Sequence, residues 1–382
     1  MTLSNKQPIC SSTFIFSLCC IDKIKCNVFL SFSCEKLTIL SVLGDVSPND
    51  LGRTLTHEHL GMNFEHFYRK PPAQIADKFS NFSLNNVGFI RQYPYSSLNN
   101  LNLNTASNAV QKGLLLFKEH GGGTIVENTT YGLNRNISFY HSVSLETGVN
   151  IVAGTGFYIT DMQADNHLHF SKEEMYDLMV KEVTEGCIDY TDVKAGFLGE
   201  IASVWPIRDF ERRAIKAAGE AQAQLGCAVS FHPHRAPDAP FEIMRLYLEA
   251  GGRADKAAMS HLDRTLLDMT VLSKFAELGS YCQFDLFGTE VSYYQLNVDT
   301  DMPSDVHRIE MIRHLVKEGK TDRILMSHDI HTKHRLVEFG GHGYSHILIN
   351  VLPRMKSKGF SQKEIDQITI ENPAKWLSMP SK

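Results

Sequence analysis

The sequence repeats one local pattern from about residue 105 onward: apolar residues at helical spacing, a glycine that ends the helix, and then a short β-rich run. The segment that begins with the capping-box residues 171–174 is typical, because its helical spacing continues to Val183 and ends at Gly186. Comparable helices end at Gly121, Gly226, Gly251, Gly279 and Gly319. Short strands that alternate with helices predict parallel βαβ units.

The β-rich runs number eight and cover residues 53–59, 124–128, 149–154, 195–201, 227–232, 257–261, 280–287 and 323–328. Eight such units predict an α/β fold, a (β/α)8 TIM barrel, for which 382 residues are sufficient. No linker divides the chain, so we assign residues 36–382 to the barrel and residues 1–35 to a poorly ordered N-terminal extension. Residues 61–104 form a long connection after the first strand, and we expect them to shape the mouth of the pocket.

Composition and charge exclude several classes of function. Hydrophobic residues make up 43% and charged residues 21%, which indicates a globular protein rather than a disordered one. The formal net charge is −5, and no block of Lys and Arg is long enough to predict a nucleic-acid partner. The apolar segment near the N-terminus is interrupted by Asp22, Lys23 and Lys25 and is too short to predict a membrane span.

The placement of the cysteines indicates the compartment. Five of the eight lie in the first 34 residues, and Cys187, Cys227 and Cys282 are scattered through the rest. This predicts a reduced, cytoplasmic protein in which the three later cysteines belong to the core. Secretion is the alternative, with residues 1–35 as a signal, although no clear cleavage site follows them.

Unusual polar residues fall at the ends of the predicted strands. His57 and His59 end the first strand two residues apart, so both side chains face the same side, which we expect to be the barrel lumen. Further strands end at Glu200, His232, His261 and Asp329. A single strand-end histidine is more often structural than a ligand, so the prediction depends on all six residues sharing the end where barrel active sites are built. Four imidazoles and two carboxylates predict a site for two divalent metal ions, with zinc expected and manganese, iron or cobalt left open.

Five short motifs resemble a known family. They are Thr-His-Glu-His-Leu at 56–60, Gly-Glu-Ile at 199–201, Ser-His-Leu-Asp-Arg-Thr at 260–265, Ser-His-Asp-Ile-His at 327–331 and Glu-Asn-Pro at 371–373. Together they resemble the phosphotriesterase family of the amidohydrolase superfamily over about residues 36–378. The resemblance implies that His57, His59 and Asp329 bind one metal, that His232 and His261 bind the other, and that Glu200 bridges them.

Two departures from the bacterial phosphotriesterases bear on the substrate. Their bridging ligand is a carboxylated lysine, whereas Glu200 supplies the carboxylate here. Their proton relay is a His and an Asp, and the matching positions here are Leu286 and Arg264, so we do not expect efficient organophosphate hydrolysis. The chain resembles an animal subgroup of the family more closely, and this implies an amidohydrolase of N-acetyltaurine and related N-acyl amino acids. The substrate expected is thus a small anionic amide, and a homodimer is left open because dimers are common in this family.

Residues near the strand ends supply roles for such a reaction. Asp329 is the expected catalytic residue, since it can accept a proton from the attacking water and pass it to the leaving amine. Arg264 lies three residues past a predicted ligand, so we expect it at the pocket rim, where a cation suits a carboxylate or sulfonate; a surface salt bridge is the alternative. Further candidates for substrate contact are Tyr158, Trp205, His331, Lys333 and Tyr344, of which Tyr158 and Trp205 could equally belong to the core.

Two other functions remain open at this point. A lactone or phosphoester hydrolase would use the same metals on neutral or phosphorylated esters. A non-catalytic, metal-stabilised binding protein would contain metal without hydrolysing anything. The sequence has no Gly-x-Ser-x-Gly elbow, no Walker A loop and no Gly-x-Gly-x-x-Gly fingerprint, so serine-hydrolase, nucleotide-triphosphate and dinucleotide chemistry are not predicted.

Overall fold

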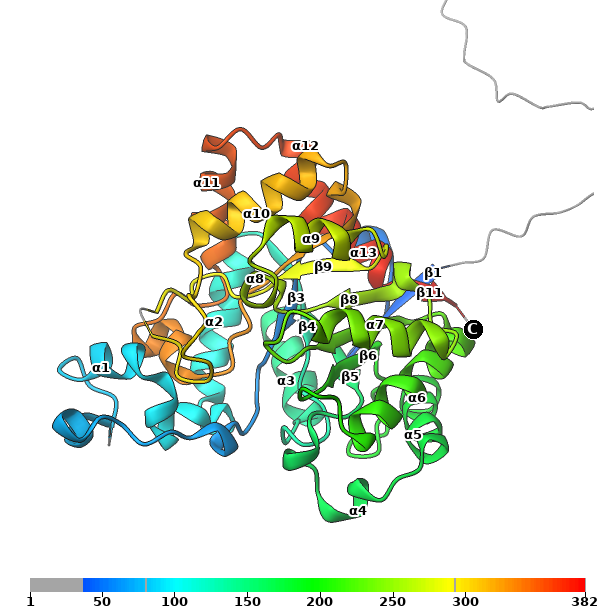
Figure 1. Ribbon diagram of the computed structural model, residues 1–382, viewed down its shortest axis with the longest axis horizontal. Coiled ribbons are helices and arrows are strands. Elements are labelled where there is room, and N and C mark those ends of the chain that lie inside the picture. The colour runs from blue at the N-terminus through cyan, green and yellow to red at the C-terminus, as the bar shows by residue number, and fades with distance from the viewer. Residues whose placement is uncertain (1–36, 80, 292, 382) are drawn as a thin grey trace, which may run out of the picture. The chain divides into compact units, whose positions relative to one another are not determined.

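Eight parallel strands, β3 to β10, form a sheet in which each strand pairs with its neighbour in chain order (Figure 1). The structure is a computed structural model that describes residues 37–79, 81–291 and 293–381, so the predicted N-terminal extension lies outside the described residues. The strands are β3 (Arg53–Glu58), β4 (Gly122–Glu127), β5 (Asn150–Thr155), β6 (Phe197–Ala202), β7 (Ala228–His232), β8 (Ala257–Met259), β9 (Tyr281–Phe284) and β10 (Ile324–Met326).

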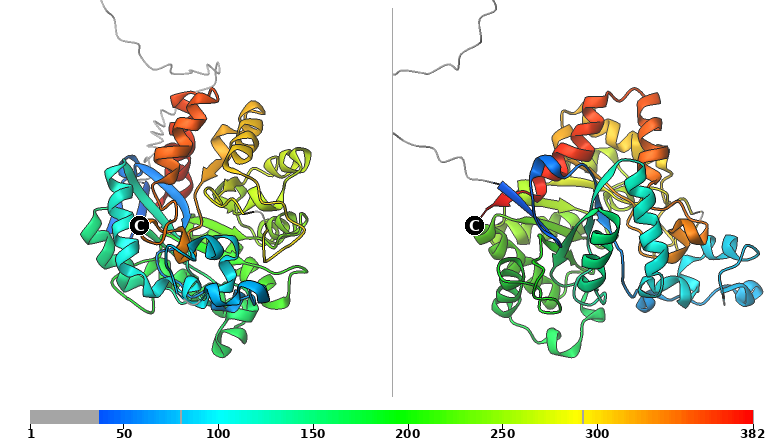
Figure 2. Two further views of the ribbon diagram at one scale, coloured as in Figure 1. Left: turned by 90° about the vertical axis from the view of Figure 1, so that its left-hand side faces the viewer. Right: turned by 180° about the vertical axis from the view of Figure 1, so that it is seen from behind.

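Hydrogen bonds between the ends of β10 and β3 bring the last strand back to the first. The Asp329 amide donates to the His57 carbonyl at 3.0 Å, and the Thr56 hydroxyl donates to the Met326 carbonyl at 3.2 Å. Seen roughly along the strands, the helices surround the sheet (Figure 2, left). The prediction of a (β/α)8 barrel is confirmed.

Helices fill the connections between the strands. They are α1 (Val87–Gln92), α2 (Ser107–Glu119), α3 (Ile137–Thr147), α4 (Asp165–Leu168), α5 (Lys172–Thr184), α6 (Asp209–Leu225), α7 (Ala239–Glu249), α8 (Leu262–Thr265), α9 (Met269–Ala276), α10 (Asp305–Lys317), α11 (Leu352–Ser357), α12 (Gln362–Asp366) and α13 (Asn372–Leu377). The capping box at the start of α5 is present, with the Ser171 hydroxyl accepting from the Glu174 amide. Gly226 ends α6 at φ 69°, a left-handed conformation that a side chain would disfavour.

A small sheet that the sequence analysis did not predict closes the N-terminal end of the barrel. It contains β11 (Met379–Pro380), β1 (Leu37–Ser41) and β2 (Gly44–Val46), in that order. Ile39 of β1 and Trp376 of α13 belong to one buried cluster with lumen residues near the starts of the strands, such as Phe197 and Ala228. Because the strands begin on this apolar plug, polar chemistry is confined to the opposite end.

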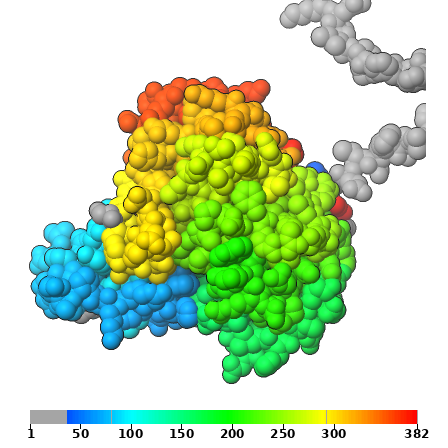
Figure 3. Space-filling view, in the orientation of Figure 1, coloured from blue at the N-terminus to red at the C-terminus, as the bar shows by residue number. Residues whose placement is uncertain are grey.

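The long connection after β3 packs against the segment that follows β9. The Tyr95 amide donates to the Gln295 side chain at 3.0 Å, and that side chain donates to the Ser96 hydroxyl at 2.9 Å. The blue surface of the first segment and the yellow surface of the second adjoin in Figure 3. None of the helices in the described part of the chain has the length and apolar character needed to cross a membrane.

Candidate metal centre

The six predicted ligands all lie at the carboxyl ends of barrel strands. His57, Glu200 and His232 are within β3, β6 and β7, and His59 directly follows β3. His261 and Asp329 follow β8 and β10 in the left-handed backbone region, at φ 58° and 55°. That conformation is unfavourable for residues other than glycine, so the surrounding structure must hold both turns in place.

One group of ligand atoms lies between the ends of β3 and β10. The Oδ1 atom of Asp329 is 3.2 Å from Nε2 of His59 and 3.8 Å from Nε2 of His57. All three residues are buried, and their candidate ligand atoms lie within 4.8 Å of one another. This matches the set that the resemblance assigns to one metal.

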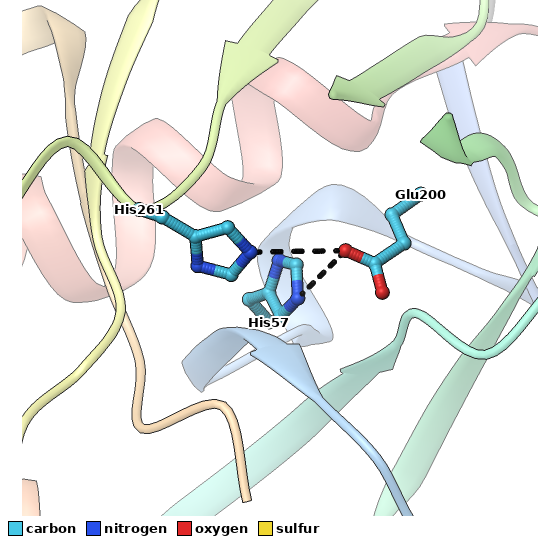
Figure 4. Close-up of side chains that lie close together, drawn as sticks. All are labelled: His57, Glu200 and His261. Carbon is cyan, nitrogen blue, oxygen red and sulfur yellow. Dashed lines mark ion pairs between the residues drawn. The ribbon is translucent and has the colours of Figure 1, made fainter. Parts of the chain in front are cut away.

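Glu200 lies between this group and the two remaining histidines. Its Oε2 atom is 3.4 Å from Nε2 of His57 and 3.8 Å from Nε2 of His261 (Figure 4), and 2.8 Å from Nδ1 of His232. Its Oε1 atom is 3.6 Å from Nε2 of His59. Oε2 thus lies between His57 and the two remaining histidines, and Oε1 faces His59, so the carboxylate contacts both groups and has the placement of a bridging ligand.

Neighbouring side chains orient three of the imidazoles toward the centre. Nδ1 of His261 is 2.8 Å from Oδ1 of Asp285, and Nδ1 of His59 is 2.9 Å from the Thr129 hydroxyl. Nδ1 of His57 is 3.0 Å from the Ser260 hydroxyl. Contacts of this kind fix the tautomer and leave Nε2 free to bind a metal.

The buried carboxylates and imidazoles of the centre favour the binding of a cation. Nε2 of His57 is buried without a hydrogen-bond partner among the described residues, so this nitrogen is available to bind a metal. Burial opposes charge on His57, but Glu200 raises the pKa of that imidazole to about 10. Burial likewise opposes charge on Glu200, yet His232 and His57 hold its pKa well below the usual range. Buried carboxylates facing imidazole nitrogens, with no thiolate among them, fit divalent ions such as zinc, and the donor set does not select among them.

A cavity of about 40 Å³ opens beside these residues. The predicted residues Tyr158, Arg264 and His331 line it together with Glu200 and Asp329. Other lining residues are Phe64 and Tyr95 from the long connection after β3 and Tyr294, Leu296 and Met302 from the segment after β9. The expectation that residues 61–104 contribute to the pocket is confirmed.

In the described part of the chain Arg264 makes no surface salt bridge, which was the alternative interpretation. Its side chain is 4% exposed, and its guanidinium lies 3.4 Å from Nε2 of His232 and 3.5 Å from the Pro233 carbonyl. No carboxylate oxygen within the described ranges lies within 4.0 Å of it. Burial lowers the pKa of this guanidinium, and the nearby Arg235 lowers it further.

Three other candidates for substrate contact lie elsewhere. Tyr344 is completely buried, and its hydroxyl donates to the His59 carbonyl at 2.9 Å, so it supports a ligand from behind. Trp205 packs at the edge of the main core, and the Lys333 ammonium donates to the Asn99 side chain at 2.6 Å. Proximity in sequence to a strand end was therefore not sufficient, because none of these three lines the cavity.

Arg235 and Tyr294 were not among the residues predicted from the sequence. Both line the cavity, and Nη2 and Nε of Arg235 donate to the Tyr294 hydroxyl at 2.6 and 3.0 Å. A signal for Arg235 was present, since it lies three residues past His232 just as Arg264 lies three residues past His261. Tyr294 lies in an irregular connection and has no comparable signal.

Comparisons with known proteins agree with this geometry. The chain is 55% identical over 345 residues to the phosphotriesterase-related protein of Drosophila melanogaster, which covers 89% of this chain and 99% of that protein. A resiniferatoxin-binding protein from Rhodobacter sphaeroides has a similar structure, with a TM-score of 0.85, 26% identity and coverage of 89% of this chain and 94% of that one. The phosphotriesterase homology protein of Escherichia coli, solved with phosphate in its active site, has a TM-score of 0.70, 27% identity and coverage of 86% and 99%.

The model of the phosphotriesterase family matches residues 37–377, which include all eight barrel strands and all six residues of the candidate centre. This chain is therefore a metal-dependent hydrolase by family, and it belongs to the phosphotriesterase family.

Proposed function

We propose that this hydrolase is a binuclear, zinc-dependent amidohydrolase that cleaves N-acetyltaurine and related small N-acyl amino acids. The products would be a carboxylic acid and taurine or an amino acid. The observation that carries the proposal is Arg264, a buried guanidinium that faces the same cavity as Asp329 and has no carboxylate partner among the residues that the structure describes. A cation placed beside a hydrolytic centre suits a substrate with an anionic end.

The six predicted ligands would form two metal sites that share one residue. His57, His59 and Asp329 would hold one ion, His232 and His261 the other, and Glu200 would bridge. Divalent ions held there would lower the pKa of water to about 7 and polarise the attacked carbonyl. Substrate binding and proton transfer would be carried out by the side chains of the protein.

Asp329 is the residue that would move the proton. Burial disfavours its charged form, but His331 and neighbouring groups keep its pKa well below the usual range, so the carboxylate is ionised, the form that binds a metal. Its Oδ2 atom lies 3.2 Å from Nδ1 of His331, which steadies it on the cavity side. An amide requires this group more than an ester with an acidic alcohol does, because an amine leaves well only when it is protonated.

The dimensions of the cavity favour a short acyl group. The cavity is small, about 40 Å³, so a compact substrate with a short acyl group suits it better than one with a long chain. With the acetyl carbonyl at the centre, the anionic end of the substrate would reach Arg264. Leu286 also lines the cavity, so the positions of the bacterial proton relay are occupied here by an apolar residue and an arginine.

Hydrolysis of N-acetyltaurine by metal-loaded protein tests the proposal, with paraoxon and a simple lactone measured beside it. We expect release of acetate and taurine, loss of that release on chelation, and recovery when zinc is returned. If only paraoxon or the lactone is hydrolysed, the amidohydrolase assignment is wrong. If nothing is hydrolysed although two metals are bound per chain, the non-catalytic binding function gains support.

A phosphoester hydrolase is the second candidate. The related protein from E. coli was solved with phosphate in its active site, and a phosphate oxyanion would suit Arg264 as well as a sulfonate does. A phosphomonoester such as p-nitrophenyl phosphate separates the two candidates. Turnover of this ester in preference to N-acetyltaurine would support the second candidate over the first.

A further inference from the structure

Two arginines from different strand ends face the metal cavity. Arg235 follows β7 and Arg264 follows β8, each three residues past a histidine of the centre. Arg264 is 4% exposed, and Arg235 is half-buried. Neither guanidinium has a carboxylate oxygen within 4.0 Å anywhere in the described part of the chain. Charges withdrawn from solvent are normally paired, so two guanidiniums on one cavity without a carboxylate partner among the described residues indicate an anionic ligand.

The charges around the cavity support the same conclusion. Glu200 and Asp329 are the only carboxylates among the described residues that line it, and both face the histidines of the centre. The two guanidiniums already balance these two negative charges. Any divalent ions held by the centre would therefore add positive charge beside the cavity, which favours an anionic ligand there.

Tyr294 holds Arg235 in position. Its hydroxyl accepts from both Nη2 and Nε of Arg235, and its ring lies 5.3 Å from the guanidinium carbon. A hydroxyl that accepts two N–H groups can still donate its own proton into the cavity. Tyr294 thus fixes one edge of the guanidinium and leaves the remaining N–H groups, including those on Nη1, for a ligand.

We propose that Arg235 and Arg264 form a single receptor for a tetrahedral oxyanion, of the sulfonate or phosphate class, at the anionic end of the substrate. In this receptor Arg235 determines specificity, and Tyr294 is its positioning residue. A planar carboxylate has two oxygens and satisfies one guanidinium fork, whereas a tetrahedral group has three and can accept from both arginines at once. The receptor deepens the proposed function, and its kinetic test depends on that function, but its binding test does not.

The binding test uses ethanesulfonate, which has no bond to hydrolyse and is a weak metal ligand. Calorimetry with the metal-loaded full chain should show that ethanesulfonate binds more tightly than propionate. Arg235→Ala should weaken ethanesulfonate binding by about tenfold to a hundredfold, the effect of removing a charged hydrogen-bond donor. Arg245→Ala, which removes an exposed arginine paired with Glu242 and Glu249 on α7, should bind as the unaltered protein does.

The kinetic test compares N-acetyltaurine with N-acetylethanolamine, its neutral counterpart. Arg235→Ala should raise KM for N-acetyltaurine by a similar factor, with little change in kcat and no change in kcat/KM for the neutral amide. Arg235→Lys keeps the charge but not the fork, so it should recover only part of the affinity. Tyr294→Phe should raise KM less than Arg235→Ala does, again with little change in kcat.

The possible results separate the receptor from the proposed function. If folded Arg235→Ala, checked by circular dichroism, binds ethanesulfonate as well as the unaltered protein does, the receptor is overturned. Equal use of charged and neutral amides would also overturn it while leaving the amidohydrolase intact. Ethanesulfonate binding that depends on Arg235, without hydrolysis of any N-acyl substrate, would uphold the receptor and refute the amidohydrolase. Propionate binding as tight as ethanesulfonate would refute the preference for a tetrahedral group.

Discussion

The metal centre and the wall of its cavity surround the same space but are built from different parts of the barrel. The six predicted ligands lie within or just after strands β3, β6, β7, β8 and β10. Much of the wall comes from connections, with Tyr95 before α2 and Tyr294 after β9. Strand ends are held by the hydrogen bonds of the sheet, whereas connections can change in length and sequence with little effect on the fold. We therefore expect changes at the centre to abolish the chemistry and changes in the wall to alter substrate choice.

Glu200→Gln should have the largest effect. Because Glu200 faces both groups of ligands, its loss should lower the metal content and reduce hydrolysis by about a thousandfold or more. Elemental analysis and turnover of N-acetyltaurine would measure the two effects. Glu220→Gln, at a carboxylate that pairs with Lys172 far from the centre, is the matched control. Full metal content and activity in the Glu200 variant would show that this carboxylate is not a ligand.

Asp285→Asn should have the next largest effect, although Asp285 is not one of the predicted ligands. Its carboxylate contacts Nδ1 of His261 at 2.8 Å, and we expect metal affinity to fall by about tenfold to a hundredfold when it is neutralised. Thr129→Val, which removes the neutral partner of His59, should have a smaller effect. Competition with a chelator measures both affinities. A larger effect at Thr129 than at Asp285 would mean that the charge of the supporting group is unimportant.

Tyr95→Phe tests whether a residue of the cavity wall affects substrate binding without affecting the metal centre. The Tyr95 hydroxyl lies 3.1 Å from Nε2 of His331, and losing this hydrogen bond should raise KM about two- to tenfold without changing metal content. Tyr93→Phe changes the same connection outside the cavity and should leave KM unaltered. A loss of metal in the Tyr95 variant would show that the wall and the centre are not separable in the way proposed.

The same contrast explains what could be predicted from the sequence. The strand ends were predictable because helix-ending glycines and apolar runs mark each strand, so His57 or Glu200 could be placed on one end of the barrel by counting. The contact of Asp285 with His261 could not be predicted, because it depends on the distance between two neighbouring strands and no local sequence pattern gives that distance. Tyr294 and Tyr95 come from connections without periodicity, and their meeting depends on how two irregular segments pack. The pairing of β1 with β11 was missed because it joins the two ends of the barrel unit, and β2 is only a three-residue partner of β1 in a local hairpin.

Tyr344→Phe should have the smallest effect and tests a residue that sequence proximity placed in the wall and the structure places behind the centre. Its buried hydroxyl donates to the His59 carbonyl, and removing it should lower the free energy of unfolding by about 1 kcal/mol because that carbonyl loses its partner. Urea unfolding measures this change, while KM for N-acetyltaurine should stay the same. A rise in KM with unchanged stability would show that Tyr344 contacts the substrate. The separation between a centre built on strands and a wall built from connections would then not hold for this residue.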